Sequence, residues 1–135
     1  MPGNFFDTNV LIYVASGDAA KADRAEALIA QGGTINVQVL NEAANVARRK
    51  MGMTWQETRD FLAGFRALLP VEPLTVETHE DGLMLSERYG LSLYDAMVAA
   101  AALRADCDVL WSEDMQDGLV IENRMRIANP FVTTS

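Results

Sequence analysis

The sequence of 135 residues has little cysteine or histidine and no long hydrophobic run. Its one cysteine, Cys107, excludes an intramolecular disulfide, and with the one histidine, His79, it excludes an ordinary Cys/His zinc site. Apolar stretches such as Ala96–Leu103 are too short to span a bilayer. The N-terminus lacks the charged segment and apolar run of a secretory signal. We therefore expect a cytoplasmic protein that does not bind a membrane.

Basic residues are also scarce. Eleven Lys and Arg against 19 Asp and Glu give a net charge of -8. Phosphate contacts dominate nucleic-acid affinity, so a dedicated nucleic-acid binder is usually basic. The acidity counts against a high-affinity DNA-binding module, but less against a nuclease whose acids are neutralised by a divalent metal. Half of the residues are hydrophobic, which predicts one folded domain over residues 1–135.

Short β-like runs alternate with helical stretches along the chain. We expect strands at Gly3–Phe6, Thr34–Val37, Val71–Leu74, Val109–Trp111 and, at a sheet edge, Arg124–Ile127. We expect helices at Ala22–Gln31, Gln38–Met51, Thr54–Leu69, Val76–Tyr89 and Leu93–Asp106, with Val10–Ser16 as either a helical turn or an irregular segment. This alternation predicts a mainly parallel sheet covered on both faces, with its ligand site at the carboxyl ends of the strands.

Four acidic residues fall where such a sheet places its site. Asp7 directly follows the first strand, and Asp114 follows the strand at Val109–Trp111. Asp95 lies in the first turn of a helix that is otherwise almost wholly apolar, and Glu42 lies early in the helix after the second strand. Converging carboxylates repel and raise one another's pKa, so their gathering needs compensation. A divalent cation supplies it, and oxygen ligands favour Mg²⁺ or Mn²⁺.

Each acid also has a purely structural interpretation. Asp7 can close the first strand in an Asx-turn, and Asp95 can complete a capping box with Ser92. Glu42 can be a solvated helix residue, the Ser112-Glu113-Asp114 segment can be a polar loop, and Asp117 is a natural turn residue. The metal hypothesis therefore depends on the joint placement of the acids and not on any one of them.

The helix that carries Glu42 also carries the densest basic run, Arg48, Arg49 and Lys50. These residues either complement the helix dipole at a solvated end or grip a phosphate beside the metal. The predicted apolar stripe of this helix is Leu40, Ala44, Ala47 and Met51. Glu42 then shares a face with Asn45 and Arg49.

Four short motifs carry the acids in a characteristic order. They are Asp7-Thr8-Asn9-Val10-Leu11, Val39-Leu40-Asn41-Glu42, Leu93-Tyr94-Asp95-Ala96 and Ser112-Glu113-Asp114. In order and spacing, from Phe5 to Phe131, the set resembles the PIN-domain family, and specifically its small bacterial VapC-like toxins. The resemblance implies an α/β three-layer sandwich, in which a central, mostly parallel five-stranded sheet has helices on both faces.

The resemblance also implies a function. Asp7, Glu42, Asp95 and Asp114 would bind Mg²⁺ or Mn²⁺, with Asp117 as an extra acid, and a water activated by the metal would cleave single-stranded RNA. Thr8, Asn9 and Ser112 would orient the ligands through hydrogen bonds. Family members are often toxins paired with an antitoxin, and often dimers. We therefore expect an RNA substrate, a small antitoxin partner and a homodimer.

Two other functions fit parts of the pattern. A phosphatase of the haloacid-dehalogenase type also places an Asp after its first strand, but it needs a second Asp two residues later, where this chain has Asn9, and a lysine near the site. A non-catalytic protein-binding module could use the same acids for a structural ion.

Overall fold

Four strands form the main sheet of the computed structural model, which describes residues 3–132. Strands β1 (Asn4–Phe6), β4 (Val109–Trp111) and β6 (Met125–Ala128) run parallel, and β5 (Val120–Ile121) is antiparallel to β6 at the edge. A second, parallel pair consists of β2 (Ile35–Asn36) and β3 (Val71–Glu72). A bridge between Phe5 and Thr34 connects the pair to β1. The predicted mostly parallel α/β sheet is confirmed, but its strands divide four and two instead of forming one sheet of five.

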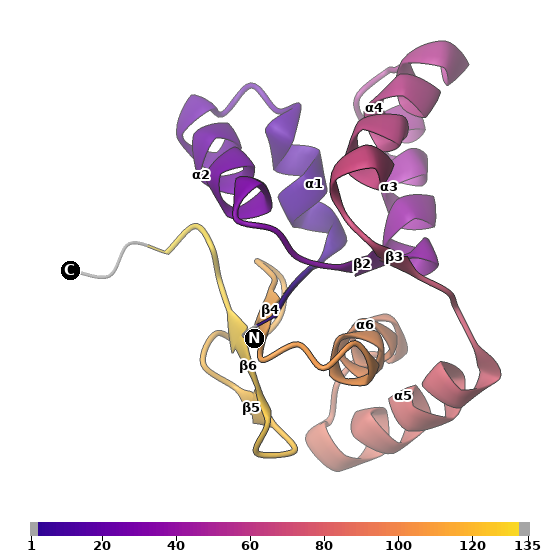
Figure 1. The fold of residues 1–135 in the computed structure, drawn as a ribbon, viewed down its shortest axis with the longest axis vertical. Coiled ribbons are helices and arrows are strands. Elements are labelled where there is room, and N and C mark those ends of the chain that lie inside the picture. The colour runs from indigo at the N-terminus through magenta and orange to yellow at the C-terminus, as the bar shows by residue number, and fades with distance from the viewer. Residues whose placement is uncertain (1–2, 133–135) are drawn as a thin grey trace.

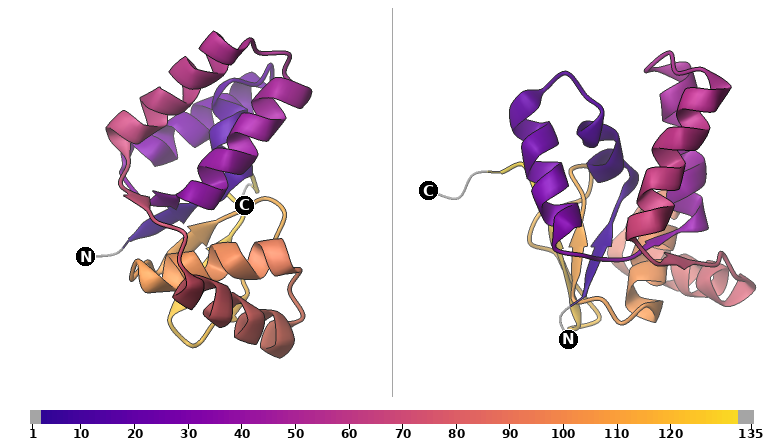
Figure 2. Two further views of the ribbon diagram at one scale, coloured as in Figure 1. Left: turned by 90° about the vertical axis from the view of Figure 1, so that its right-hand side faces the viewer. Right: turned by 45° about the horizontal axis from the view of Figure 1, so that its top comes forward.

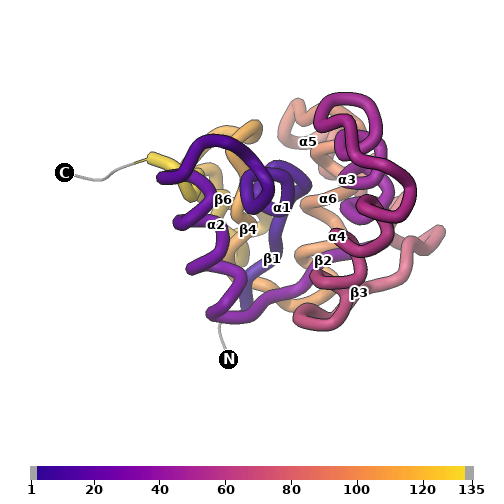
Figure 3. Tube along the Cα trace, turned by 90° about the horizontal axis from the view of Figure 1, so that it is seen from above, coloured from indigo at the N-terminus to yellow at the C-terminus, as the bar shows by residue number. Residues whose placement is uncertain are grey.

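Within residues 3–132, six helices cover the strands. They are α1 (Thr8–Val14), α2 (Ala19–Ala30), α3 (Val37–Arg49), α4 (Trp55–Leu68), α5 (Val76–Tyr89) and α6 (Leu93–Arg104). Consecutive helices pack as three pairs (Figure 1). Helix α2 lies on one side of the main sheet, and α5 and α6 lie on the other (Figures 2 and 3). None of the helices within residues 3–132 is long and apolar enough to cross a membrane.

A polar side chain caps the start of each of these helices. The caps are Asp7, Asp18, Asn36, Thr54, Thr75 and Ser92, and each accepts a hydrogen bond from a backbone N–H in the first turn of the helix that follows. Thr54 and Glu57, spaced as in a capping box, form both of its hydrogen bonds. Helix α6 is buried throughout its middle, from Ala96 to Ala102, as its apolar sequence predicts.

The structure corrects two expectations about elements and decides between the alternatives of a third. The strand predicted at the edge, now β6, lies inside the sheet because the unpredicted β5 covers it. The segment Val10–Ser16, expected as either a helical turn or an irregular segment, is helical as far as Val14 and belongs to α1. The buried stripe of α3 is Val39, Ala43 and Ala47, so it differs by one residue from the predicted stripe at Leu40 and Ala44. The predicted domain of residues 1–135 includes residues 1–2 and 133–135, which lie outside the described residues.

Candidate active site

An open pocket of about 430 Å³ lies at the carboxyl ends of β1 and β4. Its walls come from four parts of the chain: α1, α3, the start of α6 and the loop after β4. Three of the four predicted acids line it, namely Asp7, Glu42 and Asp114. Asp95 is not among the lining residues, but its charge acts on Asp7. The fold therefore brings together acids that are far apart in the sequence.

Asp7 is the buried carboxylate of this pocket, with 2% of its surface exposed. One oxygen accepts the Thr8 N–H at 2.7 Å, which caps α1, and the other accepts the Ser112 hydroxyl at 2.8 Å. Burial raises the pKa of Asp7 to about 6 although both hydrogen bonds lower it. The nearby charges of Asp95 and Asp114 make a smaller contribution to this rise, because like charges disfavour the ionised form of Asp7.

Asp95 lies in the first turn of α6, where Ser92 accepts its N–H at 3.2 Å. Burial raises the pKa of the Asp95 carboxyl, and the charge of Asp114 adds to the effect. The half-buried carboxyl thus lies at a helix start and within reach of another acid. The bond to Ser92 comes from the Asp95 backbone, so the Ser92 cap is present without the side-chain half of the predicted capping box, and the Asp95 carboxyl lies near Asp114.

The loop after β4 is held by Ser112 and Asn9. The Ser112 hydroxyl donates to Asp7 and accepts the Asp114 N–H at 3.3 Å. The Asn9 amide donates to the Asp114 carboxylate at 3.1 Å, and its oxygen accepts the Glu113 N–H at 3.2 Å. Thr8, the third residue expected to orient ligands, has its hydroxyl 2.7 Å from the hydroxyl of Tyr94.

In the structure, Glu42 and the basic run of α3 do not all point to the same place. Glu42 lines the pocket together with Val46 and Lys50, which follow it at intervals of four residues, and not with Asn45 and Arg49. Arg48 instead donates to the Met53 carbonyl at 2.6 Å and stacks on the Trp55 ring at 4.1 Å. Arg49 is exposed at the end of the helix. Of the three basic residues, Lys50 is therefore the one that lines the pocket.

Asp117 lies outside the pocket lining. Its carboxylate accepts the Asn129 N–H at 2.9 Å and so ties the loop after β4 to the segment after β6. This geometry matches the turn-residue interpretation of Asp117.

Sequence reasoning missed three polar residues of the pocket lining, Tyr13, Tyr94 and Glu113. Burial raises the pKa of the Tyr94 hydroxyl above its ordinary value, and the nearby charges of Asp7, Glu42 and Asp95 add to it. Tyr94 could have been predicted as a pocket residue, because it directly precedes Asp95 in the third motif.

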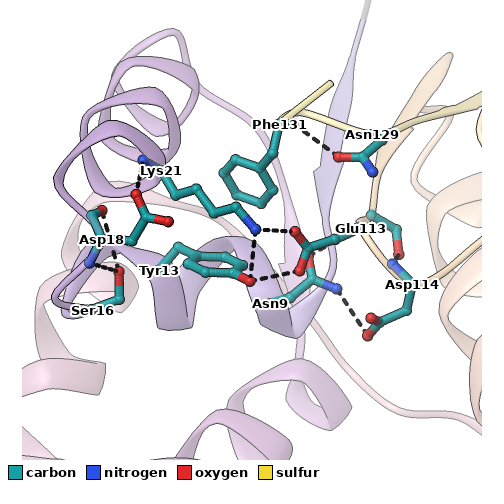
Figure 4. A network of polar contacts seen from close by, with 10 residues as sticks. Asn9, Tyr13, Ser16, Asp18, Lys21, Glu113, Asp114, Asn129 and Phe131 are labelled. Atoms are coloured by element: carbon teal, nitrogen blue, oxygen red, sulfur yellow. Dashed lines mark hydrogen bonds and ion pairs between the residues drawn. The ribbon is translucent and has the colours of Figure 1, made fainter. Parts of the chain in front are cut away.

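Glu113 points away from the acids toward Lys21 and Tyr13 (Figure 4). Burial raises its pKa, but hydrogen bonds from Lys21 and Tyr13 outweigh burial and hold the pKa below the usual value. The same bond to Glu113 raises the pKa of the Lys21 ammonium. Glu113 is therefore a paired carboxylate, unlike its neighbour Asp114.

The donor set fits a hard divalent cation. The pocket gathers carboxylate, amide and hydroxyl oxygens, the ligands that hard divalent cations prefer, around a buried carboxylate whose pKa is raised chiefly by burial. Within residues 3–132, no three Asp, Glu, His or Cys side chains stand close enough together to hold one ion. Rotation of the exposed Asp114 and of the partly exposed Glu42 and Asp95 side chains would have to complete a coordination shell around Asp7.

Solved structures share this fold at low sequence identity. A toxin–antitoxin complex from Klebsiella pneumoniae matches with a TM-score of 0.71 and 22% identity, over 96% of this chain and 98% of that chain. DNA-bound VapBC from Salmonella typhimurium matches with a TM-score of 0.71 and 18% identity, over 96% and 99%. The Sarcin-Ricin loop cleaving toxin VapC20 from Mycobacterium tuberculosis matches with a TM-score of 0.66 and 20% identity, over 80% and 87%.

Among curated proteins, no sequence matches the chain. The sequence profile of the PIN domain, in contrast, matches residues 5–116, a range that includes all four acids, most of β1 and all of β2 to β4. The family resemblance drawn from the four motifs is thus confirmed by an independent comparison. The chain belongs to the PIN-domain family.

Proposed function

We propose that the protein is a Mg²⁺- or Mn²⁺-dependent endoribonuclease that cleaves single-stranded RNA. The observation that carries this proposal is the placement, in a PIN domain, of Asp7, Glu42 and Asp114 around one pocket, with Asp95 close enough for its charge to act on Asp7. Folding would not gather repelling acids at that edge unless a cation offset the repulsion in the working protein. The cleavage activity named for the similar Mycobacterium tuberculosis toxin supports the same reaction class.

The chain's own residues have separate tasks in this reaction. The four acids would bind the metal, which, when bound, lowers the pKa of a water and neutralises charge at the phosphate. Ser112 and Thr8 hold Asp7 by hydrogen bonds, and Asn9 holds Asp114. Such contacts fix the direction of each carboxylate before substrate arrives. Lys50 would contact the RNA backbone from the far wall of the pocket.

We further propose that the protein acts as the toxin of a toxin–antitoxin pair. Its fold is shared with a toxin–antitoxin complex and with VapBC over nearly the full length of both chains. A small protein encoded next to this chain would be the partner to test by co-expression and co-purification. The expected homodimer stays a prediction, to be tested by light scattering.

The nuclease proposal is tested by cleavage of a labelled single-stranded RNA. The purified protein should cut it with Mg²⁺ or Mn²⁺ and stop with EDTA. Asp114→Asn retains an oxygen that can accept from Asn9 but removes the charge, so its loss of activity should exceed the roughly 10–100-fold typical of residues that only orient a ligand.

Asp60→Asn is the matched control, because it makes the same change at an exposed acid of α4 and should retain full activity. A second acid variant added to Asp114→Asn should cost little more, since residues that act as a unit are not additive. Cleavage at the parent rate by all four single variants, Asp7→Asn, Glu42→Gln, Asp95→Asn and Asp114→Asn, would refute the assignment and favour a structural ion.

A further inference from the structure

The side chain of Glu113 is held at both of its oxygens. Lys21 from α2 contacts Oε2 at 2.6 Å, and the Tyr13 hydroxyl from α1 donates to Oε1 at 2.7 Å (Figure 4). Lys21 also donates to the Tyr13 oxygen at 3.2 Å, which closes the triangle. Three segments of the chain thus meet at one carboxylate, which lies directly beside the metal-site residue Asp114.

Aromatic rings shield this triangle from water. The Lys21 ammonium lies 4.6 Å from the centre of the Tyr13 ring and 5.2 Å from that of Phe131. The two rings contact each other edge to face at 4.6 Å. The Lys21 and Glu113 side chains are only 33% and 25% exposed, so their pair is less screened than an ordinary surface ion pair.

Asn9 connects the triangle to Asp114. It lies one helical turn before Tyr13 on α1, and its amide group contacts both the backbone of residue 113 and the side chain of residue 114. Helix α1 therefore holds Glu113 at its backbone and at its side chain. Asp114 is exposed on a loop, so without these contacts it would sample many directions, and ordering it would cost conformational entropy.

We propose that Lys21 and Tyr13 are positioning residues for the metal site: by anchoring Glu113, they hold the loop so that Asn9 can orient the Asp114 carboxylate into the pocket. This inference rests on the proposed function, because it assigns the anchored loop to metal binding. It gives Glu113 an indirect task, which is consistent with its side chain pointing away from the acids.

The test is the affinity for Mn²⁺ alone, measured by electron paramagnetic resonance of the free ion, with no RNA present. Lys21→Met and Tyr13→Phe should each weaken Mn²⁺ binding by about 10-fold, the lower end for residues that orient a ligand. Lys21→Arg keeps a cation that can pair with Glu113 and should restore most of the affinity. Lys21→Met combined with Glu113→Gln should be no weaker than Lys21→Met alone, because both remove the same anchor.

The chain offers a matched control in a second trio of the same chemistry. Arg88 and Tyr89 bind the Glu122 carboxylate at 2.6 and 3.2 Å, away from the pocket lining. Arg88→Met should leave Mn²⁺ affinity unchanged, and melting temperatures in EDTA show whether each variant is folded. Wild-type affinity in a folded Lys21→Met protein overturns the positioning proposal alone. If the wild-type protein binds no Mn²⁺, the proposed function fails, and this inference with it.

Discussion

Asp7 has a local and a long-range task at the same position. It caps α1 through the Thr8 N–H, as an Asx-type turn residue would, and it accepts the Ser112 hydroxyl from the loop after β4. Two hydrogen bonds do not offset the burial of its charge, because its pKa is still raised to about 6. The structural and the functional interpretation of this residue therefore do not compete, and the site is placed at some cost in stability.

We expect Asp7→Asn to stabilise the metal-free protein in a pH-dependent way. An unfolded Asp has a pKa near 3.9, so the folded protein binds the proton more tightly, and the stability of the protonated form is lost as the pH rises from about 4 through about 6. Two pKa units correspond to roughly 3 kcal/mol, an upper limit for the gain at pH 7.5. Asparagine is also a good helix cap.

Urea unfolding in EDTA at pH 4.5 and 7.5 measures this difference. The variant should exceed the parent in free energy of unfolding at pH 7.5 and approach it at pH 4.5. Asp18→Asn serves as a control, because Asp18 caps α2 at an exposed position. Equal destabilisation by Asp7→Asn at both pH values would contradict the raised pKa.

At the scale of elements, the long helices and five of the six strands within residues 3–132 could be predicted from the sequence, whereas strand β5 and the full length of helix α1 could not. The apolar run of α6 is a local signal that the structure confirms, and the Thr75 cap and Gly90 end of α5 are local signals of the same kind. Helix α1 has only seven residues, of which Thr8, Val10, Ile12 and Val14 are β-branched. Its stability therefore comes from the Asp7 cap and packing against the core, which no local pattern reports.

The hairpin between β5 and β6 was missed for a similar reason. Both Glu122 and Asn123 at its turn have a positive φ, of 55° and 54°, but a hairpin is usually recognised from Asn-Gly or Asp-Gly. Contacts distant in sequence hold Glu122 there: its N–H donates to the Tyr89 hydroxyl, and its carboxylate pairs with Arg88. These contacts exist only once α5 has packed.

The same distinction applies to the candidate site. Residues at strand ends and helix starts, such as Asp7, Asp95 and Asp114, could be placed from the α/β alternation alone. The Lys21–Tyr13–Glu113 triangle joins segments whose contact depends on how α2 packs beside the loop after β4, and sequence periodicity carries no information about that packing.

Gly33 tests the junction between the two groups of strands. A Cβ there would lie 2.4 Å from the Phe6 ring and 2.9 Å from the Asn4 carbonyl oxygen, and both partners belong to β1. Gly33→Ala should therefore destabilise the protein by about 1–3 kcal/mol. Gly64→Ala, in α4 with open space around its Cβ, should instead stabilise it by about 1 kcal/mol through helix propensity. Urea unfolding checks both, and equal effects would contradict the close approach.

At the scale of the whole molecule, the negative charge of the protein repels the proposed RNA substrate. The chain carries a net charge of -8, and the pocket places several carboxylates where a phosphate would bind. Lys50 is the one Lys or Arg in the described pocket lining. A polyanion therefore meets a repulsive surface unless divalent cations bind first, so the metal should matter for RNA binding as well as for the chemistry.

We therefore expect the affinity for single-stranded RNA to depend on a divalent ion that supports little turnover. Ca²⁺ should serve, because it binds oxygen ligands with less strict geometry than Mg²⁺. Fluorescence anisotropy at matched ionic strength should show an RNA affinity at least about 10-fold higher with Ca²⁺ than with EDTA. The reason is that a cation neutralises the acids and so removes their repulsion of phosphate. Asp114→Asn should reduce this gain because it removes one acid of the pocket.

Lys50→Ala should weaken RNA binding, whereas Arg49→Ala, one residue earlier but outside the pocket lining, should not. Equal RNA affinity with Ca²⁺ and with EDTA would show that RNA binds away from the acidic pocket.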